Sequence, residues 1–230
     1  MPIEAILTDV TSLGSPRVCV AALAGNRTIR LHSPTPSESW IDNIGSLRPG
    51  DLIVVEWQPR RKSYPPHVED GDWNPTDCTK LKGLPEDELT RQLNRAAFES
   101  VEEVFGPPWI EARNGNCAFQ AGKGSRSLAS VRASSVTVRV QFGKVRVAFD
   151  DARRSWAGVP LQDLAVKRHL NSCKSCQSRG ANRLQSEFNG GPALLRVGLA
   201  REFQVGDYPS ACWMQINHVF LIPSKRNHFV

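Results

Sequence analysis

Three ionisable side chains in the first half of the chain have the types and spacing of an acid–base or metal site. His67, Glu69 and Asp70 follow two prolines, and an imidazole and carboxylates at alternate positions of an extended segment can converge on one side. Acidic residues that end a Pro-Pro loop also commonly bond their own backbone and neighbouring arginines. We favour this structural role. Because the sequence offers no stronger catalytic constellation, it predicts a protein that is not an enzyme.

His169, Cys173 and Cys176 have the only metal-like spacing in the sequence. Two thiolates separated by two residues can bind one tetrahedral zinc, but a second pair is absent, and Cys78 or Cys117 would have to complete the site through the fold. The six cysteines of a chain without a secretion signal are expected to stay reduced. We therefore expect a surface loop with reduced thiols, no bound metal and no cofactor.

Positive charge is concentrated in the second half of the chain. Residues 1–112 carry 11 Lys and Arg against 17 Asp and Glu, whereas residues 113–230 carry 18 against 6. Residues 113–185 alone hold 14 basic and three acidic side chains, which is typical of a surface that faces a polyanion. A solubility patch or a contact for an acidic protein is the alternative. The predicted nucleic-acid-binding side chains are Lys123, Arg126, Arg132, Arg139, Lys144, Arg146, Arg153 and Arg154.

Two further features of the sequence suit a nucleic acid. Residues 115–126 combine three glycines with Lys123 and Arg126, and backbone N–H groups of such a loop can approach phosphates. The loop lacks the spacing of a P-loop, which argues against nucleotide hydrolysis. Trp73 and Trp109 lie in loop or turn contexts and can stack bases, although a tryptophan near a proline is as often a lid over the core.

One long helix is the clearest element that the sequence predicts. Apolar residues recur at three- and four-residue spacing over residues 84–106, Pro85 suits the first helical position, and Gly106 is followed by two prolines. The flanking segments read mainly as strands. The predicted organisation is a β-unit at residues 1–83, a connecting helix at 84–106 and a basic β-unit at 107–230.

A tight hairpin is expected in the first unit. Residues 17–24 and 27–31 flank Gly25-Asn26, which suits a two-residue turn, and Ala24 is expected opposite Arg27. This register puts Arg30 on the outer face. Residues 58–78, rich in Pro and Asp and without periodicity, are expected to form a long loop.

A second hairpin is expected in the basic unit. Residues 136–142 and 145–149 flank Gly143-Lys144, and placing Phe142 opposite Val145 puts the valines of both strands on one face. Arg139 and Arg146 then share the exposed face.

The order of strands, hairpins and a short helix on each side of the long helix is compatible with two OB-like barrels. Five short motifs resemble the prokaryotic dual OB-containing domain family: Arg30 with Pro34, residues 52–57, residues 65–70, residues 198–203 and residues 212–217. The resemblance covers most of the chain. It implies a mainly β fold, two OB-like barrels joined by one long α-helix, and a nucleic-acid-related setting without a defined activity.

We therefore predict a non-enzymatic nucleic-acid-binding protein that holds single-stranded or structured DNA or RNA on the basic face of its second β-unit. The alternative is a protein-interaction subunit of a prokaryotic defence or mobile-element complex, whose basic half docks an acidic partner. No apolar run is long enough to span a membrane, and the first residues lack the features of a signal peptide. We expect a cytoplasmic protein that does not bind membranes.

Overall fold

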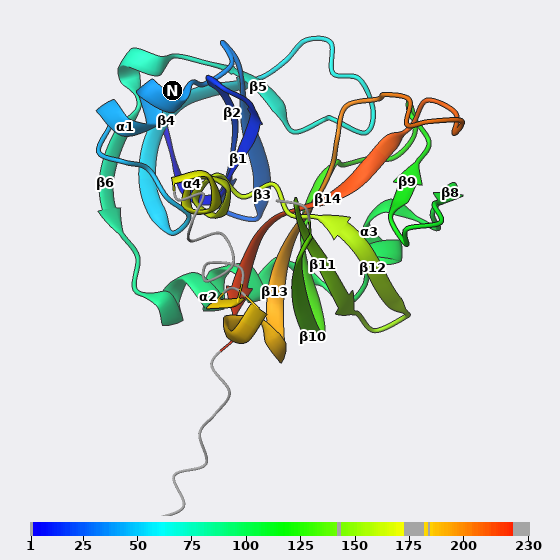
Figure 1. Ribbon diagram of the computed structural model, residues 1–230. Helices are drawn as coiled ribbons and strands as arrows, with labels where there is room; N and C mark the ends of the chain where they lie inside the picture. Colours follow the sequence, from blue (N-terminus) through cyan, green and yellow to red (C-terminus); the bar gives the residue numbers. More distant parts are fainter. Residues whose placement is uncertain (1, 142–143, 173–181, 184, 223–230) are drawn as a thin grey trace, which may run out of the picture.

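The computed structural model describes residues 2–141, 144–172, 182–183 and 185–222. Strands dominate, and they form two β-units that lie against each other (Figure 1). None of the helices within these ranges is long and apolar enough to cross a membrane.

The first β-unit is a closed five-stranded barrel. Its strands follow the order β1-β2-β3-β5-β4, β4 pairs back with β1, and β3 and β5 are parallel. An extra strand, β6, pairs antiparallel with β4, and a short helix, α1, lies between β3 and β4. The elements are β1 Pro2–Gly14, β2 Arg17–Ala24, β3 Arg27–Ser33, α1 Glu38–Asn43, β4 Asp51–Pro59, β5 Asp70–Trp73, a 3-10 turn at Pro75–Asp77 and β6 Thr79–Gly83.

The β2–β3 hairpin confirms the predicted register, because Ala24 pairs with Arg27 and Ala22 pairs with Ile29. Its outer face departs from the prediction. Leu23 is 5% exposed and Arg30 is 6% exposed, because the second β-unit covers this face of the barrel. The predicted loop at residues 58–78 also contains a strand, β5, which closes the barrel.

The predicted helix at residues 84–106 is two helices with a short strand between them. These are α2 Glu86–Arg95, β7 Ala97–Phe98 and α3 Val101–Phe105. Ser100 starts α3 by accepting a hydrogen bond from the Glu103 backbone N–H, while the Glu103 carboxylate accepts one from the Glu99 N–H. This Ser-x-x-Glu capping pattern competes with helix continuation, and β7 gains backbone partners by pairing with β10.

The second β-unit repeats much of the first. Its sheet has the order β12-β11-β10-β13-β14-β9-β8, and helix α4 follows β12 as α1 follows β3. Just after β12, Leu161 forms a parallel bridge with Ile216, and the Gln162 N–H donates to the Ile216 carbonyl at 2.8 Å. Strand β12 therefore meets β14 as β3 meets β5. The elements are β8 Ile110–Glu111, β9 Cys117–Phe119, β10 Leu128–Gln141, β11 Lys144–Asp150, β12 Ser155–Pro160, α4 Leu164–Ser172, β13 Asn189–Leu199 and β14 Cys212–Leu221.

The β10–β11 hairpin has a register two residues away from the predicted one. Val140 pairs with Val145, Val138 pairs with Val147, and the turn residues 142–143 lie outside the described ranges. The prediction that Phe142 stands opposite Val145 is therefore wrong. Side chains alternate with a period of two, so a shift of two leaves each on its predicted face. The valines are largely buried, and Arg139 lies directly opposite Arg146 on the outer face.

Candidate nucleic-acid interface

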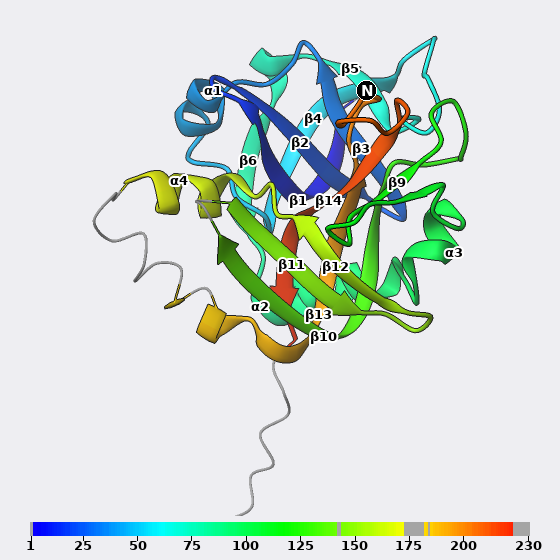
Figure 2. The same ribbon diagram turned by 45° about the vertical axis from the view of Figure 1, so that its right-hand side comes forward.

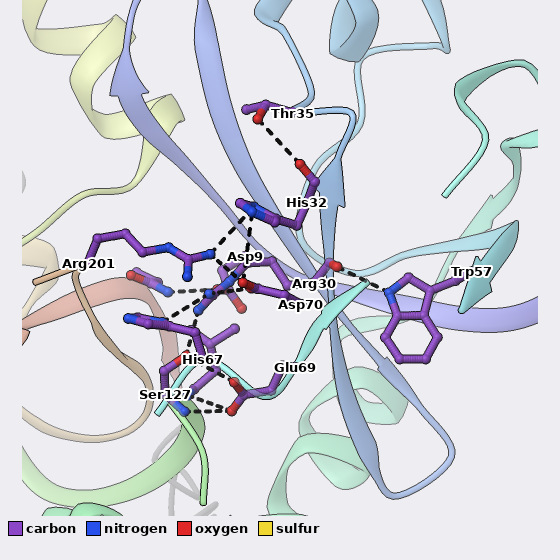
Figure 3. A network of polar contacts seen from close by, with 12 residues as sticks. Asp9, Arg30, His32, Thr35, Trp57, His67, Glu69, Asp70, Ser127 and Arg201 are labelled. Atoms are coloured by element: carbon purple, nitrogen blue, oxygen red, sulfur yellow. Dashed lines mark hydrogen bonds and ion pairs between the residues drawn. The ribbon is translucent and has the colours of Figure 1, made fainter. Parts of the chain in front are cut away.

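His67, Glu69 and Asp70 lie where the two β-units meet, inside a network of polar contacts (Figure 3). The Glu69 carboxylate accepts hydrogen bonds from the backbone N–H groups of Ser127 at 2.7 Å and Leu128 at 3.1 Å, and from the Ser127 hydroxyl at 3.0 Å. Glu69 therefore satisfies donors at the start of β10. Asp70 bonds to an arginine, Arg30, as we expected, whereas Glu69 bonds to a segment 58 residues later in the chain and not to its own loop.

Arg30 is the centre of this network. It lies on the outer face of the first barrel, as its strand register predicted, but the second unit buries it. Its Nη1 atom is 2.8 Å from Asp70 Oδ1 and 3.3 Å from His67 Nδ1, while Nη2 donates to Ser127 Oγ at 2.9 Å. Burial by itself would raise the pKa of Asp70, but Arg30 and Arg201 outweigh it and hold that pKa below its usual value. Burial and the Arg30 charge lower the pKa of His67 to about 3.

A second buried ion pair joins the two units. Arg196 Nε donates to Asp9 Oδ1 at 2.8 Å, Asn217 Nδ2 donates to Asp9 Oδ2 at 2.8 Å, and Arg196 Nη1 donates to Ser130 Oγ at 3.0 Å. These contacts use Asp9 and Arg196 for internal bonding. Across the described residues, no group of His, Cys, Asp and Glu side chains could hold a metal ion. The hydrogen bonds of Glu69, Arg30 and Arg196 connect the two units at this junction.

Stability should fall as the pH is lowered, because His67 is buried as the neutral imidazole. The pKa of His67 is about 3 in the folded protein and about 6.5 for an unperturbed histidine, so between these values the unfolded chain binds more protons. The free energy of unfolding should drop by up to about 1.4 kcal/mol for each unit of pH in this window. The ionised Asp70 and Asp9 add a further loss below about pH 4, since their pKa values are held low.

Urea titrations from about pH 7 to about pH 4 measure this dependence. His67→Asn, whose amide oxygen can replace the Nδ1 acceptor, should reduce the slope between about pH 6 and pH 5. The remaining slope comes from His32, because burial also lowers its pKa. An equal slope in the wild type and the variant would contradict a neutral buried His67.

A cavity of about 660 Å³ in the second β-unit collects basic side chains. It lies between β11, the chain just after β12, helix α4 and the connection from β13 to β14. Arg113, Lys144, Arg146 and Lys167 line it, and none of the described lining residues is Asp or Glu. Burial lowers the pKa of Lys167, whose ammonium group donates to the Gln162 side chain. We call this space the basic cavity.

Three aromatic side chains line the same cavity: Phe203, Tyr208 and Trp213. The Trp213 indole N–H donates to the Phe203 carbonyl at 3.3 Å, the Tyr208 ring meets the Trp213 ring edge-on at 5.7 Å, and the Tyr208 hydroxyl accepts from the Arg113 N–H. The connection itself is closed by a backbone pair between Phe203 and Ala211. Phe203 is nevertheless 46% exposed, so one aromatic side chain is accessible at the cavity.

Three of the eight predicted binding residues lie at or beside the basic cavity. Lys144 and Arg146 line it, and Arg139 is the cross-strand partner of Arg146 on the same outer face. Arg146 also donates to the Gly158 carbonyl at 3.2 Å through Nη1. Lys123 and Arg126 line a different cleft, beside Trp109.

The other three predicted residues are engaged with acidic or carbonyl partners. Arg132 holds the end of α2 through the Asn94 carbonyl and also pairs with Glu99. Arg153 lies 3.7 Å from a Glu102 carboxylate oxygen, and Arg154 pairs with Glu111 at 2.7 Å and stacks on Trp156. The structure does not bring these residues to the basic cavity.

Sequence reasoning missed Arg113, Lys167, Phe203 and Tyr208 as cavity residues. Two aromatics in a turn-rich connection between two strands were the available signal, because loops at a barrel end often carry binding residues. Cys173 and Cys176, which have zinc-like spacing but for which we expected no bound metal, lie outside the described residues, and His169 belongs to α4. Trp73 packs on the core of the first β-unit, where it is 7% exposed and contacts Trp40.

No model of a known protein family matches the chain, and no curated protein matches it. Among solved structures, the chain is similar to a murine DNA binding protein bound with ds DNA, at 8% identity over 97% of each chain with a TM-score of 0.36. It is similar to the Ifi202 HINa domain in complex with 20bp dsDNA, at 9% identity over 96% of this chain and 95% of that chain with a TM-score of 0.37. It is also similar to a Replication Protein A heterotrimer bound to ssDNA, at 12% identity over 95% of this chain and 49% of that chain with a TM-score of 0.37. TM-scores this low do not establish a shared fold or function. The resemblance to the prokaryotic dual OB-containing domain family stays a prediction.

Proposed function

We propose that this chain is a non-enzymatic nucleic-acid-binding protein built from two OB-like barrels, and that the second barrel binds the nucleic acid. OB-type barrels bind oligonucleotides on the outer face of their second and third strands and on the neighbouring loops. In the first unit that face belongs to β2 and β3, and the second unit covers it. In the second unit the corresponding strands are β11 and β12, beside the basic cavity.

The composition of the basic cavity is the observation that carries this proposal. Four cationic side chains attract phosphates, and the exposed Phe203 offers a face on which an unpaired base can stack. A cavity lined without carboxylates favours a polyanion over a neutral or cationic ligand. Since a base must leave its pair to stack on Phe203, we propose that the ligand is a single strand or an unpaired part of a structured DNA or RNA.

Arg139→Gln together with Arg146→Gln tests the charge on this face. Arg139 is exposed, and Arg146 loses only its hydrogen bond to the Gly158 carbonyl, so the free energy of unfolding should fall by no more than about 1.5 kcal/mol. The affinity for single-stranded DNA or RNA at low salt should fall about tenfold. The slope of log affinity against log salt should flatten by about 0.7 for each phosphate contact that is lost. Fluorescence anisotropy at several salt concentrations measures both quantities.

Arg48→Gln together with Arg95→Gln is the matched control, because it removes two exposed positive charges from the first unit and from α2. This control should leave the affinity and the salt slope unchanged. An unchanged salt slope in the Arg139 and Arg146 variant, with an intact melting transition, would place the nucleic acid elsewhere. If the wild type binds no strand at low salt, the proposal is wrong and a protein-interaction subunit with an acidic partner becomes the better hypothesis.

A further inference from the structure

We propose that residues 60–66 of the first unit and residues 120–126 of the second unit form one surface that binds the phosphate backbone of the same strand held at the basic cavity. We call it the bridging surface. The inference rests on the proposed function and extends it, because it makes the ligand a strand long enough to contact both β-units.

The two loops of the bridging surface touch each other. The Gly122 N–H donates to the Pro65 carbonyl at 3.1 Å, and a Cβ atom placed on Gly124 would lie 3.5 Å from the Pro66 Cβ. The loops run side by side at the upper right of the molecule (Figure 2). Gly122 and Gly124 have φ angles of 71° and 91°, which L residues rarely adopt, so glycine gives the second loop its shape.

Positive charge exceeds negative charge at the first loop, where Asp72 lines a hollow with Arg61 and Lys62 but pairs with Arg60. Arg61, Lys62 and Lys123 are exposed, and within the described residues none of the three has a carboxylate partner. Neither loop contains Asp or Glu. Three residues of extended chain span at most about 11 Å, so the Cα atom of Lys62 lies within that distance of the Cα atom of Pro65. Pro65 in turn contacts the second loop through Gly122. By contrast, Arg60 lies 3.5 Å from Asp72 and is left out of the set.

Exposed aromatic side chains accompany these charges. Trp109, which is 48% exposed, lines a cleft of about 310 Å³ together with Lys123 and Arg126. Tyr64, which is 73% exposed, belongs to the first loop, and its backbone carbonyl accepts from the His67 N–H at the turn. Cations interleaved with accessible aromatic rings are the arrangement that follows a single strand, since phosphates meet the cations and bases stack on the rings.

The bridging surface and the basic cavity lie next to each other along β13. Leu199, the last residue of that strand, lines the cleft beside Trp109, and its chain neighbour Ala200 lines the basic cavity. The two hollows therefore meet the end of β13 from opposite sides, because successive side chains of a strand point to opposite faces. In the proposed path, a strand that leaves the basic cavity passes round the end of β13 and the β8–β9 segment to reach Trp109 and Lys123.

Oligonucleotide length separates the two contacts. We would measure the affinity of single-stranded DNA of about 5 and about 20 nucleotides, because one OB-type barrel covers about 4–16 nucleotides. The test variant carries Arg61→Gln, Lys62→Gln and Lys123→Gln. It should bind the long strand about tenfold more weakly than the wild type, with a salt slope flatter by up to about 2, and bind the short strand as the wild type does. The control with Arg48→Gln, Lys82→Gln and Arg95→Gln loses the same charge on other exposed surfaces and should match the wild type with both strands.

An unchanged affinity for the long strand in the test variant would overturn the bridging surface and assign its charge to another acidic partner. An equal loss with both strands would also overturn it, because a strand of about 5 nucleotides held at the basic cavity should not reach both loops. Failure of the proposed function itself looks different. In that case the Arg139 and Arg146 variant binds the short strand as tightly as the wild type.

Discussion

Arg196→Met should lower the free energy of unfolding by about 3–5 kcal/mol. The Arg196 and Asp9 side chains are 2% and 1% exposed, and their ion pair joins the two β-units. Removing the guanidinium leaves the Asp9 carboxylate buried with only the neutral donors Thr8 and Asn217. Removing one partner of a buried ion pair strongly lowers the free energy of unfolding, because the remaining charge stays desolvated without a counter-charge. Urea denaturation measures the loss.

Two further variants test this explanation. Adding Asp9→Leu to Arg196→Met removes both charges and should restore much of the lost stability, because replacing a whole buried pair by apolar groups is often nearly neutral. Arg168→Met breaks the exposed contacts to Glu38 and Asp42 and should change the free energy of unfolding by less than about 1 kcal/mol. If Arg196→Met and Arg168→Met lower the free energy of unfolding equally, burial does not explain the contribution of the Asp9–Arg196 pair.

Phe203→Ala should weaken single-strand affinity by about 5- to 150-fold, since stacking on an aromatic side chain contributes about 1–3 kcal/mol per base. The variant removes no charge, so the slope of log affinity against log salt should stay that of the wild type. This separates it from the arginine variants on β10 and β11, which should change the slope. Anisotropy titrations with a strand of about 5 nucleotides give both numbers.

Leu81→Ala is the control for Phe203→Ala. Leu81 is 49% exposed on β6, so the substitution removes a similarly exposed apolar side chain far from the basic cavity in the chain. It should leave the affinity unchanged. Equal affinity of Phe203→Ala and the wild type would mean that no base stacks there, and the cavity would then bind phosphates alone.

Local patterns in the sequence determined the strands and their faces. The Gly25-Asn26 turn gave the right register for the first hairpin, because a two-residue turn leaves one way to pair the flanking strands. In the β10–β11 hairpin the predicted turn was two residues away from the observed one, yet Arg139 and Arg146 still lie on the predicted face. Alternation with a period of two tolerates that error. The sequence also favoured a bonding role for Glu69, but its partners Ser127 and Leu128 belong to the other unit and were not predicted.

Contacts between residues far apart in the chain were decided only by the tertiary structure. Arg30 has the pattern of an exposed strand residue and is buried because the second unit supplies Ser127. The predicted long helix is divided because β7 finds a partner strand in β10, about 30 residues later in the chain. The basic cavity brings together residues from 113 to 215 of the chain. Nothing in the local sequence distinguishes its cations Arg113 and Lys167 from Arg132 and Arg154, which form ion pairs with glutamates in the fold. Charge can be counted in a sequence, but only the fold determines which charges have partners and which are available to a ligand.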